Sequence, residues 1–130
     1  MIRRALPAVG LILALGCGDS GQPPSGAGDL LVAYHAGNGD AGAMVLTITG
    51  GAVESVSAIG AHQVSFSTPY PTTTRVVVIG AGELATGDLL RIRVPDVSKA
   101  TSYVVRADQV ADKASFALIS PSQHTFTVHP

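Results

Sequence analysis

The sequence predicts an all-β domain, an antiparallel β-sandwich of about eight or nine strands. Short apolar stretches alternate with turn residues at nearly even spacing, which is typical of sandwiches. Small and β-branched residues dominate the 46% apolar content, and 15 glycines and 8 prolines supply turns. Helical periodicity is weak and confined to residues 96–101 and 108–114.

The first half of the domain shows the strand pattern most clearly. Residues 43–49 alternate, with Met44, Leu46 and Ile48 on one face and Val45, Thr47 and Thr49 on the other. Asn38-Gly39-Asp40 and Gly50-Gly51 are turn signals that bound this strand. The other expected strands are 29–35, 53–59, 62–68, 75–79, 89–94, 103–110, 116–118 and 125–128.

The two prolines at 69 and 71 predict that the chain leaves the sheet after residue 68 and holds Tyr70 outward. A domain of about 100 residues buries roughly 60 to 70% of its unfolded surface, so it needs neither a disulfide nor a metal. The expected core is Met44, Leu46, Ile48, Phe66, Val76, Val78, Leu90, Ile92, Val94, Tyr103, Val105, Phe126 and Val128.

Residues 1–16 have the build of a signal peptide, with Arg3 and Arg4 before an apolar run that is shorter than the roughly 20 residues of a membrane-spanning helix. The run ends at LALGC, which resembles the lipobox of bacterial lipoproteins. The resemblance implies that Cys17, the only cysteine, is lipidated with acyl chains such as palmitate and becomes the mature N-terminus. Two or more acyl chains hold a protein stably on a membrane.

The chain therefore divides into a signal peptide (1–16), a lipid-anchored flexible tether (17–28) rich in Gly, Ser and Pro, and a β-sandwich (29–130). The expected location is the cell envelope, on a membrane. In a cell with two membranes, Gly18 after the cysteine resembles the signal for outer-membrane sorting.

Residues 76–85 combine four β-branched residues with a G-x-G-x-x-A match that resembles a dinucleotide-binding turn. Such a turn needs a long helix after the glycines, whose N-terminus receives the pyrophosphate. Here the alternating residues Leu90, Ile92 and Val94 follow a second turn almost at once. We therefore expect strand, loop and strand, with no nucleotide and no cofactor.

The remaining sequence features that could indicate a metal site, a protease or a nucleic-acid-binding surface are as weak as the dinucleotide-binding match. His35, His62, His124 and His129 show none of the close pairing of metal ligands and are expected at the surface or at strand edges. Gly18-Asp19-Ser20-Gly21 resembles the nucleophile segment of serine proteases but lies in the tether. Eight basic residues against nine acidic ones leave no basic stripe for nucleic acid. We predict no catalytic, cofactor-binding or metal-binding residue.

The strand order resembles that of cohesin-like domains of bacterial surface proteins. The similarity lies in GDLLV (28–32), AMVLTIT (43–49), VESV (53–56) and TGDLLRIRV (86–94). It implies a jelly-roll-like sandwich that recognises another protein with one sheet face. An immunoglobulin-like sandwich is the alternative fold. The expected function is thus a non-catalytic binding or assembly module of the cell envelope. A small hydrolase or metal-dependent enzyme using scattered His and Asp residues, and a structural accessory subunit of an envelope complex, remain alternatives.

Overall fold

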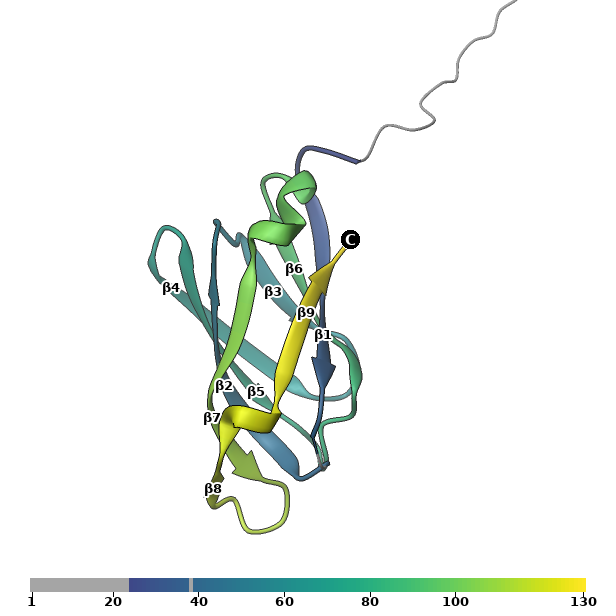
Figure 1. Cartoon of the computed structure of the whole chain (residues 1–130), viewed down its shortest axis with the longest axis vertical. Helices are drawn as coiled ribbons and strands as arrows, with labels where there is room; N and C mark the ends of the chain where they lie inside the picture. The colour runs from purple at the N-terminus through teal and green to yellow at the C-terminus, as the bar shows by residue number, and fades with distance from the viewer. Residues whose placement is uncertain (1–23, 38) are drawn as a thin grey trace, which may run out of the picture.

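A computed structural model describes residues 24–37 and 39–130. They form two antiparallel sheets packed face to face (Figure 1), which confirms the predicted all-β sandwich. The four-stranded sheet has the order β3 (Ser55–Ala58), β6 (Gly87–Val94), β1 (Gly28–His35), β9 (Thr125–His129). The five-stranded sheet has the order β4 (Gln63–Tyr70), β5 (Thr73–Ile79), β2 (Ala41–Thr49), β7 (Val104–Asp112), β8 (Leu118–Ile119).

Consecutive strands mostly lie in different sheets. Only β4–β5 and β7–β8 are neighbours both in sequence and in a sheet. Two short 3₁₀ helices, η1 (Val97–Ser102) and η2 (Pro121–Gln123), lie in connections that change sheets. Because the chain crosses between the layers so often, the inner faces of both sheets must assemble together.

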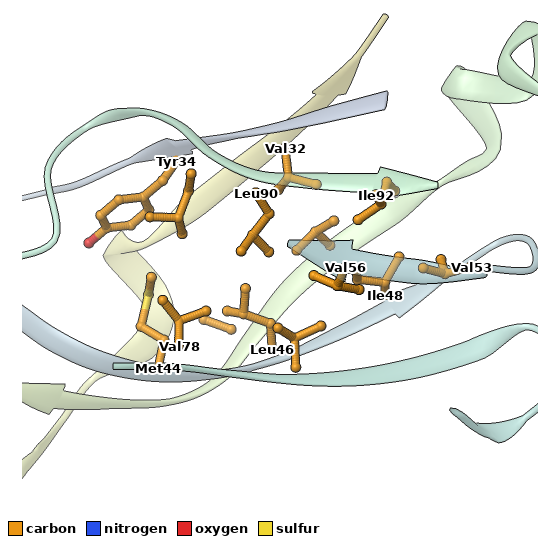
Figure 2. Packing of buried hydrophobic residues seen from close by; sticks show 14 of the residues in the cluster. Val32, Tyr34, Met44, Leu46, Ile48, Val53, Val56, Val78, Leu90 and Ile92 are labelled. Carbon is orange, nitrogen blue, oxygen red and sulfur yellow. The ribbon is translucent and has the colours of Figure 1, made fainter. Parts of the chain in front are cut away.

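The core lies between the sheets, where alternate residues of each strand point inward (Figure 2). Val32, Leu90 and Ile92 of the four-stranded sheet face Leu46 and Ile48 of the five-stranded sheet, and all five are 0% exposed. Every expected core residue is buried except Phe66, Phe126 and Val128. The last two are half-buried and pack against the core from β9.

Strand β4 differs from the prediction in two ways. It does not end before the prolines, because it continues through Pro69 to Tyr70, with a register shift between Ser67 and Tyr70. Since β4 is an edge strand, a residue without an N–H is tolerated there. Phe66 is 40% exposed rather than buried, because it lies on this edge strand.

The two weak helical candidates have different outcomes. Residues 96–101 largely coincide with η1, where the Asp96 side chain accepts hydrogen bonds from the Ser98 and Gly26 backbone N–H groups. Residues 108–114 are not helical, because β7 runs to Asp112 and buries Val110. Gly26 also accepts a hydrogen bond from the Val97 N–H, so the described chain begins at the η1 end of the sandwich (Figure 1).

Candidate functional site

The outer faces of the two sheets differ in chemistry. On the four-stranded sheet the outward residues are mostly polar, with Leu31 as an apolar exception. Asp29 lies 3.6 Å from Arg93 and 3.9 Å from Arg91, and Ser55 and Ser57 flank them on β3. On the five-stranded sheet the outward residues near one end are apolar. We call the following six residues the apolar face: Ala43, Val45, Val77, Ile79, Ala111 and Leu118.

The apolar face is continuous across four strands because its members are paired cross-strand neighbours. Ala43 is paired with Ile79 on one side and Ala111 on the other, and Ala111 is paired with Leu118. Val45 is paired with Val77 in the next row. The exposed fractions of Val77, Ile79 and Leu118 are 38%, 49% and 68%, so solvent reaches this patch.

A charged cluster bounds the apolar face on the side of η1. Asp108 lies 3.2 Å from Arg106 and 3.7 Å from Arg75, and it accepts a hydrogen bond from the Thr47 hydroxyl. Partial burial alone would raise the pKa of Asp108, but the bonds from Thr47 and Arg106 and the two guanidinium groups outweigh it and lower that pKa. Arg75 and Arg106 remain largely exposed, so they can still meet a carboxylate from outside.

A buried polar pair lies at the end of the sandwich opposite η1. The Tyr34 hydroxyl and His124 Nδ1 are hydrogen-bonded at 2.6 Å, although the residues are 90 positions apart. Tyr34 is 0% and His124 5% exposed, and Tyr34 also stacks on Phe126 with ring centroids 5.4 Å apart. Burial raises the pKa of Tyr34 to about 12 and lowers the pKa of His124, so both groups stay neutral at pH 7.

The loops beside this pair are joined by an exposed lysine. Lys113 Nζ donates to Glu83 Oε1 at 3.0 Å and to the Gly39 carbonyl at 3.1 Å. The hydrogen bond to Glu83 is the main cause that raises the pKa of Lys113. This arrangement connects the β1–β2, β5–β6 and β7–β8 loops. Both Lys113 and Glu83 are engaged in it, so neither side chain is free to act as a nucleophile or a base.

The four histidines do not form one site in the described part of the chain. His35 is hydrogen-bonded to the Thr127 hydroxyl, and His62 is hydrogen-bonded to the Leu89 carbonyl. His129 Nε2 lies 2.8 Å from a carboxylate oxygen of Asp88. Among residues 24–37 and 39–130, no group of three His, Cys, Asp or Glu residues could hold a metal ion. The expectation of surface positions is wrong for His124, which is buried against Tyr34.

The glycine-rich stretch after β5 forms a loop, and β6 begins at Gly87, so the predicted strand, loop and strand are confirmed. Leu84 anchors this loop, being 2% exposed and donating its N–H to the Ala41 carbonyl at 2.8 Å. A hollow of about 280 Å³ lies beside it, lined by residues 59–62 and 80–89, with acidic Glu83 and Asp88 and no Lys or Arg among them. Gly80 is required for close packing, since a Cβ there would lie 2.7 Å from the Gly82 carbonyl oxygen.

Cys17, Ser20 and the predicted signal peptide lie outside the described residues. Within the described ranges, no helix is long and apolar enough to cross a membrane. Comparisons with protein-family models, with curated proteins and with solved structures gave no match.

Two features were not predicted as parts of a site. The apolar face has a signal in the sequence, because β5 carries apolar residues on both faces in the run Val76-Val77-Val78-Ile79. An alternation of buried and solvated residues would have placed polar residues at Val77 and Ile79. The Tyr34–His124 pair has no local signal, since neither residue is near the other in sequence.

Proposed function

We propose that the chain is an exported, lipid-anchored, non-catalytic module of the bacterial cell envelope that binds a protein partner through the apolar face. The exposed, continuous set of apolar cross-strand pairs carries this proposal. Large exposed apolar patches on soluble domains mark interaction sites, because water leaves them favourably when a partner covers them. The sequence resemblance to cohesin-like domains, which recognise proteins with one sheet face, favours the same function.

The size of the sheet suits such an interface. Five strands spaced about 4.8 Å apart give a width of about 24 Å, and β2 rises about 20 Å from Ala43 to Thr49. The whole outer face, of which the apolar face is one end, therefore presents an area of the order of 500 Å² in projection. Specific interfaces bury about 800 Å² of accessible surface on each partner, which a textured surface of this footprint approaches.

The charged cluster beside the apolar face indicates the chemistry of the partner. Arg75 and Arg106 share the single carboxylate of Asp108, so the cluster has an excess positive charge at its solvent side. A partner with an apolar patch and an acidic residue beside it would match both parts. Rim charges of this kind contribute more to association rate and orientation than to affinity.

The position of the apolar face also suits a membrane anchor at Cys17. The described chain enters at the η1 end (Figure 1), where Gly26 is hydrogen-bonded to Asp96. Ala43 and Ile79 lie near the start of β2 and at the end of β5, whereas the other end of β2 leads to Gly50, beside Ser102 of η1. An anchor preceding residue 24 would hold the η1 end toward the membrane. The apolar face would then lie on the part of the sheet that is farther from the lipid, where a partner can reach it.

The interface is tested by placing a photoreactive amino acid at Val77 of the full chain in producing cells, with the same amino acid at Thr127 on the polar outer face as the matched control. We expect an adduct of defined mass from Val77 and none from Thr127, and we expect Ile79→Asp to remove it. A Val77 probe that gives no adduct, or adducts of the same kind from both positions, would refute the apolar face as the binding site.

The anchor is tested separately with Cys17→Ser. We expect this variant to lose labelling by a fatty-acid probe and to move from the membrane to the soluble fraction, because the lipid provides the membrane affinity. Unchanged membrane retention of Cys17→Ser would contradict the anchor. It would leave the crosslinking result at Val77 standing on its own.

A further inference from the structure

Strand β4 is the outermost strand of the five-stranded sheet and pairs only with β5 among the described strands. An edge strand leaves alternate backbone N–H and C=O groups without a strand partner, which makes it a template for another strand. Phe66, in the middle of β4, is 40% exposed at this edge. Both the hydrogen-bonding groups and an apolar side chain are therefore available there.

The other sheet edges are shorter. β8 has 2 residues, β3 has 4 and β9 has 5, whereas β4 has 8. Proteins usually protect an exposed edge with charged side chains, proline or a bulge. In β4 the protection is confined to the end near the hairpin, where Pro69 and the register shift lie, because Gln63–Ser67 contains no charged residue. This half of β4 remains open.

We propose that the open half of β4 pairs with the same segment of a second copy of this chain, antiparallel and centred on Ser65. The segment can pair with an identical segment because it carries no charge, so the pairing brings no like charges together. Its residues alternate in polarity, and antiparallel pairing of identical strands about one residue places inward residues opposite inward residues. The two five-stranded sheets then continue into each other.

Pro69 selects the register. Pairing centred on Phe66 would place Pro69, which has no N–H, opposite Gln63 of the second copy. Pairing centred on Ser65 uses only residues 63–67 and avoids Pro69. In this register Ser65 faces its own equivalent on the outer side. On the inner side Phe66 of each copy lies opposite Val64 of the other, which covers the exposed part of Phe66.

The resulting contact closes on itself, because both copies contribute the same segment and a paired segment has no edge left to recruit a third copy. It is also small. Five paired residues bury less than the roughly 1,000 Å² that a stable interface needs, so the dimer is transient in solution. Anchoring both copies on one membrane would favour it by raising their local concentration. That strengthening depends on the proposed anchor, whereas the pairing of β4 does not.

The pairing is tested by thiol crosslinking of the full chain in producing cells, using Ser65→Cys and a short bismaleimide. Directly opposed residues have Cα atoms about 5 Å apart, so we expect about fivefold or more dimer from Ser65→Cys than from Ser57→Cys on the outer side of β3. The chain with native Ser65 carries Cys17 alone and reports any crosslink through that residue. Adding Phe66→Lys to Ser65→Cys should remove most of the dimer, because it replaces the apolar contact of Phe66 with Val64 by a charge and sets two like charges at diagonal positions of the pair.

A band of twice the chain mass that requires both the Ser65→Cys substitution and native Phe66 supports the pairing. The proposal is overturned by equal crosslinking from Ser57→Cys, by an unchanged dimer yield in the presence of Phe66→Lys, or by an adduct with a chain of another mass. Absence of any dimer band also overturns it. Ser67→Cys serves as a second variant, since Ser67 faces Gln63 in this register and should crosslink less than Ser65→Cys.

Discussion

Tyr34→Phe removes a single hydroxyl from the buried pair and keeps the ring that stacks on Phe126. Tyr34 is 0% and His124 5% exposed, so water cannot readily replace the 2.6 Å hydrogen bond to Nδ1. A buried polar atom that loses its partner costs about 1 to 3 kcal/mol. We expect the free energy of unfolding to fall by about 2 kcal/mol, since the remaining His124 ring stays in place.

Equilibrium urea unfolding at pH 7.5 measures this loss as a lower midpoint at constant slope. At about 4 °C per kcal/mol for a domain of this size, the thermal midpoint should fall by about 8 °C. Tyr70→Phe is the matched control, because Tyr70 is 68% exposed and its hydroxyl reaches solvent. Tyr34→Phe and Tyr70→Phe with the same midpoint as the unmodified chain would show that the buried hydrogen bond contributes nothing.

The same pair sets a pH dependence at both ends of the scale. Burial raises the pKa of Tyr34 from 10.0, the value of an ordinary tyrosine, to about 12. The stability that neutral Tyr34 contributes is therefore complete below pH 10 and is lost as the pH rises to about 12, because the unfolded chain loses the proton first. Two pKa units correspond to about 2 to 3 kcal/mol, and Tyr34→Phe should lack this loss. The pKa of His124 is lowered, so its contribution to stability falls as the pH decreases below 6.5, where the unfolded chain takes up the proton first. The raised pKa of His129 acts in the opposite direction, so His124→Gln isolates the effect of His124.

Two further predictions concern the core and one turn. Leu90→Ala should lower the free energy of unfolding by about 2 to 5 kcal/mol in urea, because Leu90 is 0% exposed, and Leu118→Ala, at 68% exposure, should change it by less than about 0.5 kcal/mol. Gly50→Ala should cost about 2 kcal/mol or more, because Gly50 has φ +103° and a Cβ there would overlap the Ser102 carbonyl oxygen. Gly82→Ala should leave the thermal midpoint almost unchanged, because a Cβ at Gly82 would meet open space. Equal decreases of the midpoint in Gly50→Ala and Gly82→Ala would contradict the role of Gly50 in this turn.

Alternation along the chain was sufficient to predict where most strands lie. β2, β5 and β6 each repeat an inward apolar residue at every second position, and the buried residues Leu46, Val78 and Ile92 follow from that period. Turn residues then placed the strand ends to within a few positions. The period alone does not say which strand lies at the edge of a sheet. Phe66 was therefore expected in the core, although among the described strands β4 has no neighbour other than β5 to cover it.

The sequence by itself determined the class of fold and the side of each strand that is buried, because those depend on the two-residue period of an extended chain and on turn chemistry. Only the tertiary structure decided which outward residues meet. Val45, Val77 and Leu118 become one patch through the strand order β5–β2–β7–β8, and Tyr34 reaches His124 through the packing of β1 against the end of η2. Strand order and interlayer packing depend on contacts between residues far apart in the chain, which local patterns do not encode.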